Sequence, residues 1–366
     1  MRPLHDGPSE MVDLAIVIVS ANSARWLDRC LSSVFAHAGS AKLDVIVVDN
    51  SSTDGTRELV ESHFPLVRVV SSPNRGFAYG NNRGLEQTNA RFELLLNPDT
   101  EIVDGSFGEL VDLLDERPQV GLAGVRQIAS DGTLWPSMRR FPSVCRALGE
   151  ALYSEHWPVQ PAWAGERVLD QSAYRREGEC DWTSGSFMLT RREALLSAGL
   201  LDERFFLYCE EPDLCSRIKR AGWQIRHMPQ MTIIHHAGKD GVQPRMVAQD
   251  AYARKQYAHK HFGPVNRSLY VAACGLRHLI RIANTRSKTA EGAAQREGSR
   301  QALRSLAGRG EPPFGTPPPT AVEPPAFAQW LRAARPWANT RTMASMPATS
   351  SEPAAGSDMS LSGRDA

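Results

Sequence analysis

Short apolar runs alternate with stretches of helical periodicity through the first hundred residues of the chain. Two such runs, at residues 14–19 and 45–48, consist mainly of Val and Ile, and the stretch between them places apolar residues three and four positions apart. The runs predict buried strands, and the spacing between them predicts an amphipathic helix. Strand, helix and strand in this order form a βαβ unit, in which the two strands are parallel.

The same alternation continues through the next part of the chain. Further strands are predicted at residues 67–70, 92–96, 187–190 and 232–234, with helices before or between them. Near-continuous apolar strands joined by helices are typical of a mainly parallel sheet that helices cover on both faces, so we expect an α/β fold. Residues 136–179 are richer in Trp, Pro and Arg and less periodic, which suits an insertion that forms a lid or faces a substrate.

The chain changes character after about residue 260. Apolar positions at helical spacing then alternate with four arginines, which predicts a basic amphipathic helix. The remainder is rich in Ala and Arg and then in Pro, Ser and Ala, a composition that buries too little apolar surface to offset chain entropy. We therefore expect a flexible leader at residues 1–12, an α/β domain at 13–265, the basic helix at 266–288 and a disordered tail at 289–366.

Composition narrows the classes of function. The 42 Lys and Arg residues balance 41 Asp and Glu residues, so the chain lacks the basic surplus typical of nucleic-acid-binding proteins. No apolar stretch approaches the roughly 18 to 20 residues that span a bilayer. The first apolar run is short and follows acidic residues, unlike a secretion signal. The six cysteines form no CxxC pair, so we expect reduced thiols in a cytoplasmic protein.

Acidic residues follow two of the predicted strands, and ligands of open parallel sheets bind beyond the carboxyl ends of the strands. Asp49 ends the second strand, where its carboxylate would accept hydrogen bonds from a nucleobase or a ribose. Alternatively, Asp49 or the nearby Asp54 caps the following helix. Asp99 follows a later strand through Asn97-Pro98. There it either holds Mg²⁺ or Mn²⁺ at a diphosphate or forms part of an ordinary turn.

Two further groups of ionisable residues lie later in the chain. Glu210, Glu211 and Asp213 begin a predicted helix, and their mutual repulsion would raise the pKa of one of them, as in a general base. The alternative is a solvated helix start, although the flanking apolar residues FFLY favour burial. His235 and His236 follow the last predicted strand. One imidazole would meet the cation or the diphosphate, or the pair is structural.

A glycine-rich segment, SPNRGFAYGNNRGL, lies between the third and fourth predicted strands. Its glycines would let the backbone approach a ligand, with Asn74 and Asn82 as candidate ligand-binding amides, or they would permit tight packing. The segment lacks the GxGxxG pattern after a first strand, which disfavours a nicotinamide dinucleotide.

Seven segments in this order resemble the family 2 glycosyltransferases of the GT-A fold, and within that family the rhamnosyltransferase-like branch. They cover roughly residues 14–240 and read IVIVSANSARWLDRCLSSV, VIVVDNSSTDGT, NRGFAYGNNRGL, LLLNPDTEI, DWTSGSFMLTRREAL, LDERFFLYCEEPDLCSRIKRAGW and IIHHAG. Each motif alone is modest, but seven in order are specific. The resemblance implies the GT-A nucleotide-diphospho-sugar transferase fold, with the sheet and helices expected above.

The resemblance also implies roles for individual residues. Glu211 matches the position of the catalytic base, with Glu210 and Asp213 shaping its charge and the acceptor site. Asp99 and His235 are implied to meet the divalent cation, Mg²⁺ or Mn²⁺, that holds the diphosphate. The set of residues that would bind the donor is Asn22, Asp49, Asn74, Asn82, Asn97, Trp182 and Gly185.

Three positions depart from the family pattern. Ala21 replaces an aromatic residue that would stack on the base, and Asn97 replaces the first acid of a full DxD element. Glu211 stands where Asp is usual, which lengthens the side chain by one methylene and keeps its chemistry. With fewer protein charges at the metal, we expect low metal affinity in the absence of nucleotide.

The implied reaction is an inverting transfer from a nucleotide-sugar donor, dTDP-rhamnose or alternatively a UDP- or GDP-sugar. The implied acceptor is a hydroxyl of a polyprenyl-linked or other cell-envelope saccharide, and the basic helix would either rest on an anionic membrane surface or pack against the domain. A nucleotidyltransferase is disfavoured because SANSARW, and no glycine-rich basic loop, follows the first strand. An inactive sugar-nucleotide-binding protein is disfavoured by the joint presence of Asp49, Asp99, Glu211 and His235.

Overall fold

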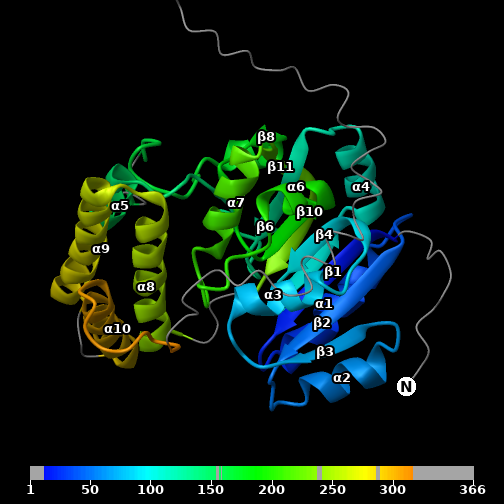
Figure 1. Ribbon diagram of the computed structural model, residues 1–366, viewed down its shortest axis with the longest axis horizontal. Coiled ribbons are helices and arrows are strands. Elements are labelled where there is room, and N and C mark those ends of the chain that lie inside the picture. The colour runs from blue at the N-terminus through cyan, green and yellow to red at the C-terminus, as the bar shows by residue number, and fades with distance from the viewer. Residues whose placement is uncertain (1–11, 154–155, 158, 237–240, 286–288, 316–366) are drawn as a thin grey trace, which may run out of the picture.

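The computed structural model describes residues 12–153, 156–157, 159–236, 241–285 and 289–315. The chain forms a sheet flanked by helices and, beside it, a bundle of helices (Figure 1). Apart from Val12, which begins the first strand, the expected leader lies outside the described residues.

The main sheet has nine strands within the described ranges. They are β1 (Val12–Ser20), β2 (Leu43–Asn50), β3 (Arg68–Ser72), β4 (Ala90–Leu96), β5 (Thr100–Asp104), β6 (Val120–Ile128), β8 (Gly178–Glu179), β10 (Phe187–Arg191) and β11 (Gln224–His235). The order is β3-β2-β1-β4-β10-β6-β11-β5, and β8 pairs with β11. Strands β3, β2, β1 and β4 are parallel to one another. β10 runs antiparallel to β4 and β6, whereas β11 is parallel to β6 and antiparallel to β5.

Helices cover both faces of this sheet because its central strands are apolar on both sides. Ile16 and Ile18 of β1 pack with three helices on one face, and Val17 and Val19 pack with three others on the opposite face. On the first face these are α1 (Ala24–Ala36), α2 (Thr56–His63) and α4 (Phe107–Asp115); on the second they are α3 (Phe77–Leu85), α6 (Arg192–Ala198) and α7 (Glu210–Arg220). The predicted α/β architecture is therefore confirmed.

The irregular interval predicted at residues 136–179 contains several short elements. It begins with β7 (Met138–Arg139), which pairs with β9 (Trp182–Thr183) in a separate small sheet. It then forms α5 (Val144–Ala151) and the 3₁₀ helix η2 (Gln171–Arg175). Helix α5 packs against the C-terminal helices, so the interval links the two parts of the molecule (Figure 1).

The bundle consists of α5, α8 (Pro244–His261), α9 (Pro264–Asn284) and α10 (Ala290–Leu306). The helix predicted at residues 266–288 corresponds to α9, which begins two residues earlier. Helix α8 falls within the range predicted for the α/β domain, yet it packs against α9 and α10. None of the helices in the described ranges combines the length and apolar character needed to cross a bilayer.

The disordered tail predicted from residue 289 is wrong for its first part, because α10 occupies Ala290–Leu306. Its hydroxyl cap, Thr289, accepts a hydrogen bond from the backbone N–H of Gly292 at 3.0 Å. Ala302 and Leu306 are buried in the bundle core. Small residues such as Gly298 allow α10 to lie close to α8. The helix therefore packs stably with few large apolar side chains, and its composition alone does not predict that it is ordered. Residues 316–366 of the predicted tail lie outside the described residues.

Candidate functional site

The carboxyl ends of β1 and β2 bring Asn22 and Asp49 to the same edge of the sheet. The Asn22 side-chain oxygen accepts a hydrogen bond from the backbone N–H of Thr53 at 2.8 Å, which joins the two loops. Asp49 is nearly buried, and one of its oxygens accepts from the backbone N–H of Ser52 at 3.0 Å. Asp54 binds the backbone N–H of Ala24 at 2.9 Å, at the start of α1, so it acts as a structural cap.

Asp99 and His235 meet at the same edge because β5 and β11 pair in the register that sets His235 opposite Thr100. The Oδ1 atom of Asp99 lies 3.4 Å from Nε2 of His235. The neighbouring His236 has other partners. Its Nδ1 lies 2.9 Å from the Ser130 hydroxyl and its Nε2 lies 3.2 Å from the Glu101 carboxylate. His235 is thus the histidine that faces Asp99.

The chemistry of Asp99 and His235 fits a small divalent cation. A carboxylate oxygen and an imidazole nitrogen are both ligands of Mn²⁺, and a carboxylate oxygen suits Mg²⁺. Within the described part of the chain, no group of three or more His, Cys, Asp or Glu side chains could hold a metal ion. Asn97, which precedes Asp99, adds no charge. An ion held by Asp99 and His235 would therefore take its other ligands from water or a diphosphate.

Glu210 and Glu211 begin α7 after two residues with left-handed backbone, Tyr208 (φ 69°) and Cys209 (φ 68°). One Glu211 carboxylate oxygen accepts a hydrogen bond from the backbone N–H of Gly185 at 3.2 Å. A Cβ atom at position 185 would lie 2.7 Å from that oxygen, so only glycine allows this approach. Two loops far apart in sequence thereby hold the Glu211 carboxyl group in place.

Both carboxyl groups bind protons more tightly than usual. Burial, and then the charge of Glu211, raises the pKa of Glu210 well above its ordinary value. Burial also raises the pKa of Glu211, against the hydrogen bonds that favour its ionised form. A carboxylate with a raised pKa is a stronger base near neutral pH, as the sequence analysis expected for this pair.

A cavity of about 470 Å³ opens beside Glu211, between the sheet and the helical bundle. Trp182 and Ser184 line it on the sheet side, and residues of α8, α9 and α10 line it on the other. The Arg139 guanidinium also lines it and lies over the Trp182 ring, 5.4 Å from the ring centroid. Glu211 and Trp182 are thus placed together, next to a space large enough for a small ligand.

Comparison with known proteins decides the family of the chain. The family model described as glycosyl transferase family 2 matches residues 15–195. The N-acetylglucosaminyl-diphospho-decaprenol L-rhamnosyltransferase of Mycobacterium tuberculosis is 31% identical over 241 residues, which are 61% of this chain and 76% of that protein. The chain belongs to glycosyl transferase family 2.

Other relatives support this assignment. The rhamnosyltransferase WbbL of Escherichia coli is 24% identical over 234 residues, 62% of this chain and 84% of that protein. Among solved structures, GalNAc-T7 with UDP, GalNAc and Mn²⁺ is similar with a TM-score of 0.51 at 13% identity, over 72% of this chain and 55% of that one. The predicted GT-A fold and glycosyltransferase class, in a rhamnosyltransferase-like branch, are confirmed.

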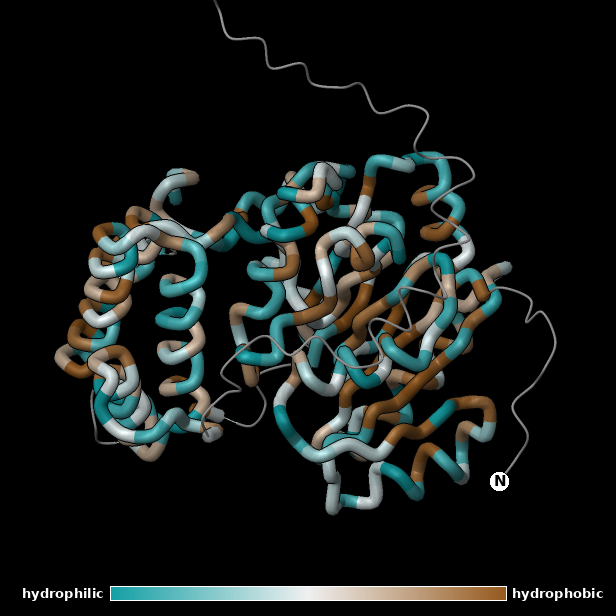
Figure 2. The backbone as a smooth tube through the Cα atoms, in the orientation of Figure 1, coloured by the Kyte–Doolittle hydropathy of each residue, from teal (hydrophilic) through white to brown (hydrophobic). Residues whose placement is uncertain are grey.

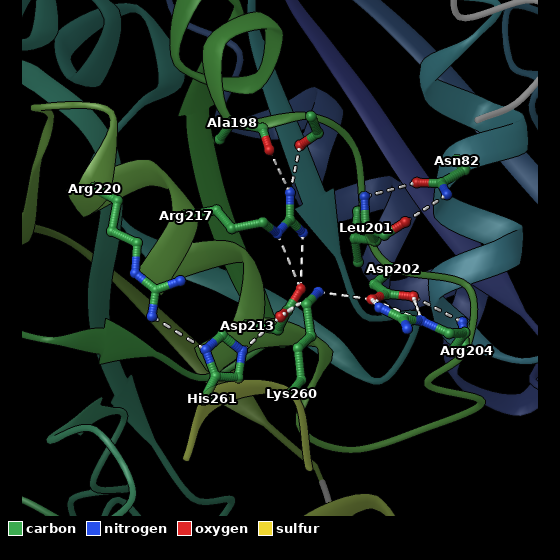
Figure 3. A network of polar contacts seen from close by, with 11 residues as sticks. Asn82, Ala198, Leu201, Asp202, Arg204, Asp213, Arg217, Arg220, Lys260 and His261 are labelled. Atoms are coloured by element: carbon green, nitrogen blue, oxygen red, sulfur yellow. Dashed lines mark hydrogen bonds and ion pairs between the residues drawn. The ribbon is translucent and has the colours of Figure 1, made fainter. Parts of the chain in front are cut away.

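The structure of the glycosyltransferase gives Asp213 a different position from the one expected. Asp213 is fully buried, with Lys260 at 2.6 Å, His261 at 2.8 Å and Arg217 at 3.0 Å (Figure 3). Burial alone would raise the pKa of Asp213, but the hydrogen bond from His261 and the two cations hold it below its ordinary value. Asp213 joins α7 to the end of α8 and does not line the cavity beside Glu211.

Asn82 also has a structural position in the glycosyltransferase. Its amide is buried, donates to the Leu201 carbonyl at 2.9 Å and accepts from the Leu201 N–H at 3.1 Å, so it fixes the loop that leads to α7 (Figure 3). The glycines of α3 serve close packing, since a Cβ at Gly84 would lie 2.3 Å from a Val17 methyl group in β1. Asn74 is exposed, and its side-chain oxygen accepts from the Gly76 N–H at 3.3 Å.

Most residues that line the cavity are not among the candidates from the sequence, and they include Arg139, Arg254, Arg277 and Gln295. These four come from β7, α8, α9 and α10, so only tertiary packing brings them together. The sequence predicts a basic helix after residue 260 and leaves open whether it lies on a membrane surface or packs against the domain. The glycosyltransferase turns some of these cations toward its interior.

Proposed function

We propose that the protein transfers a sugar, with inversion, from a nucleoside diphosphate donor to a hydroxyl group of a lipid-linked or other cell-envelope saccharide. The observation that carries this proposal is the Glu211 carboxyl group, which the Gly185 N–H holds and which lines the same cavity as Trp182. Asp99 and His235 supply the second requirement, a pair of side chains suited to a cation at the diphosphate. Asp49 and Asn22 supply polar groups for the nucleoside.

The mechanism follows from these groups. Glu211 accepts the proton of the acceptor hydroxyl as its oxygen bonds to the anomeric carbon, and the bond from that carbon to the diphosphate oxygen breaks with its electron pair leaving on the diphosphate. A cation at Asp99 and His235, when bound, neutralises charge on the diphosphate. His235 lies against the edge of Trp135, with ring centroids 5.3 Å apart, which keeps its imidazole oriented. A single displacement needs no covalent intermediate.

The donor that we propose is dTDP-rhamnose. Support comes from the names of two relatives, both rhamnosyltransferases, and from the NPDT and EEPDL segments, which resemble that branch. Asp49 is the residue proposed to read the base. UDP- and GDP-sugars would fit the same arrangement of carboxylates, so the nucleotide must be tested directly.

The acceptor that we propose is linked to a lipid, and the enzyme acts on the inner face of the cell membrane. The relative from M. tuberculosis is named for a diphospho-decaprenol acceptor. The outward face of α9 is apolar: Val265, Leu269, Leu276 and Leu279 are exposed by 72%, 51%, 37% and 55%. Figure 2 shows hydrophobic positions along α9, the helix farthest from the sheet in that view. An exposed apolar stripe of this kind suits contact with a bilayer.

Charge supports the same orientation. Residues 241–285 contain seven Arg and Lys side chains and a single Asp. Arg254, Lys260 and Arg277 pair with carboxylates inside the protein, so the attraction to anionic lipids would come from the other basic residues. The two alternatives considered for α9, contact with a membrane and packing within the protein, are compatible. Tyr270 and Cys274 are buried in the bundle, while the leucines on the other side of the helix face outward.

Ligand-induced stabilisation tests the donor. The melting temperature of the full chain would be measured with dTDP, UDP and GDP and with their sugars, each with and without Mn²⁺ or Mg²⁺. We expect the largest shift with dTDP ligands and metal, and a smaller shift for the variants Asp49→Asn and Asp99→Asn. A shift confined to UDP or GDP ligands would replace the proposed donor. No shift with any nucleotide would contradict the proposed function.

A further inference from the structure

Most residues that line the cavity beside Glu211 lie outside the segment that the family model matches. Glu211 and Trp182 lie on the sheet side, and the opposite wall comes from α8, α9 and α10. Trp182 lies within the matched residues, whereas Glu211 and all three helices follow residue 195, where the match ends. The match to the family model therefore gives no information about what the wall formed by α8, α9 and α10 binds.

Two buried nitrogen donors on opposite walls have no acceptor in the part of the chain that the structure describes. The Nε atom of Arg139 and the Nε2 atom of Gln295 are both buried, and neither has a hydrogen-bond partner among the described residues. Both residues line the cavity. Buried donors are normally satisfied, so unsatisfied donors on two residues that line one cavity indicate a ligand that brings acceptor oxygens.

The charges around the cavity favour an anionic ligand. Its lining includes five arginines and three carboxylic acids, namely Arg139, Arg167, Arg254, Arg277, Arg281, Glu166, Glu211 and Asp250. Two of the acids are bound to a single cation, since Arg254 lies 2.8 Å from Glu166 and 3.2 Å from Asp250. The remaining acid, Glu211, is the proposed base. The lining thus carries more basic than acidic side chains, and the Arg139 charge also acts on Glu211.

We propose that this cavity binds the acceptor as a saccharide diphosphate, with the reacting hydroxyl at Glu211 and the diphosphate between Arg139, Gln295 and the arginines of α9. Guanidinium groups bind phosphate oxygens through paired hydrogen bonds, and the amide of Gln295 adds a donor from the opposite wall. The inference rests on the proposed function. It adds that the C-terminal bundle, and not the sheet, recognises the diphosphate of the acceptor.

Binding of a lipid diphosphate without a sugar tests this subsite alone. The probe is farnesyl diphosphate, titrated into the full chain by calorimetry with EDTA present, and farnesol is the uncharged comparison. We expect binding that Arg139→Lys and Gln295→Leu each weaken by at least about tenfold, because each loses a hydrogen bond to a phosphate oxygen. Arg139→Lys keeps the positive charge, and thermal unfolding of each variant verifies that it folds.

A matched variant separates this cavity from the donor site. Asp99→Asn changes the proposed cation site and should leave farnesyl diphosphate binding unchanged in EDTA. If Asp99→Asn changes the affinity while Arg139→Lys and Gln295→Leu do not, the probe occupies the donor site and the inference is overturned. Equal affinity for farnesol would overturn it as well, because the diphosphate would then contribute nothing.

Transfer assays distinguish this inference from the proposed function. With a diphosphate-linked saccharide as acceptor, Gln295→Leu should raise KM by about tenfold with kcat unchanged. With the same saccharide as a simple alkyl glycoside, KM should not change. Equal rises in both KM values would assign Gln295 a structural role and overturn the inference. If the wild type transfers no sugar from any donor, the proposed function fails while the binding measurement still decides the subsite.

Discussion

Glu211 is the single side chain on which the proposed reaction depends most directly. Glu211→Gln keeps the shape of the side chain and an oxygen that can accept from the Gly185 N–H, but it cannot take a proton. We expect kcat to fall by roughly 100- to 10,000-fold, the usual contribution of a general base. Donor affinity, measured by calorimetry, should be unchanged. The exposed Glu109→Gln in α4 is the control, and a parallel loss of donor affinity in Glu211→Gln would count against a catalytic role.

The raised pKa of Glu211 sets the pH dependence of transfer. A base works only when it is ionised, so activity should be lost as pH falls through the pKa of this group. Because burial raises that pKa, kcat/KM should begin to fall at a pH above the ordinary pKa of glutamate, which is about 4.3. The profile is measured under first-order conditions in substrate. An activity that stays constant down to about pH 4.5 would exclude Glu211 as the base.

Some of the candidate site residues could be placed correctly from the sequence, and others could not. Asp49 and Asp99 could be located from the sequence because each directly follows an apolar strand, and strand ends of parallel sheets meet at one edge. Asp213 and Asn82 could not be assigned correctly, since their partners lie 48 and 119 residues away and their burial depends on those contacts. Their roles in donor or acceptor binding are therefore not part of our proposal.

At the scale of elements, the buried Asp213 joins α7 to α8 and so couples the base-bearing helix to the bundle. Replacing it with Asn leaves Arg217 without its buried anion, whereas Lys260 loses one of two, since Asp202 also lies 2.6 Å from it. We expect Asp213→Asn to lower the free energy of unfolding by about 3 to 5 kcal/mol, as is usual when one partner of a buried ion pair is removed. Urea denaturation at neutral pH measures this value. Asp112→Asn, on the exposed face of α4, should change stability little, and equal effects of the two variants would contradict the assignment.

The pH dependence of that contact follows from the same charges. The pKa of Asp213 is held below its unfolded value, so its contribution to stability is fully present above the unfolded pKa of about 3.9. It is lost as pH falls below that value. The difference in stability between wild type and Asp213→Asn should therefore shrink under acidic conditions, as measured by urea denaturation at several pH values. A constant difference between pH 7 and about pH 2.5 would contradict the linkage.

Most elements of the sheet and one helix of the bundle, α9, could be predicted, but the packing of the bundle could not. Strands such as β1 and β2 are nearly continuous runs of apolar, mostly β-branched residues, and such runs can be recognised from the sequence alone. Helix α10 is rich in Ala, Gly and charged residues, and its burial appears only when α8 lies against it. The cavity was missed for the same reason, because its walls belong to elements that are unrelated in sequence.

For the whole molecule, the apolar face of α9 and the basic surplus of the bundle predict attachment to anionic bilayers. The double variant Leu276→Glu and Leu279→Glu should lose most of its sedimentation with phosphatidylglycerol vesicles at low salt, because it places charge on the contacting face. Turnover with a water-soluble acceptor should be retained. Leu66→Glu is the control, since Leu66 is 82% exposed in the α/β part. Equal sedimentation of all three proteins would contradict the proposed membrane face.

Helix α9 contacts different surroundings on its different sides, so the number of residues in the helix is constrained. Arg277 and Arg281 line the cavity, while Leu276 and Leu279 face outward, so neighbouring positions belong to different surfaces. Each residue of an α-helix advances the direction of its side chain by about 100°. A single-residue insertion after Cys274 would therefore rotate every later side chain, moving the leucines away from the outer surface and the arginines away from the cavity. Substitutions in this helix can be tolerated one by one, whereas insertions and deletions should remove both surfaces at once.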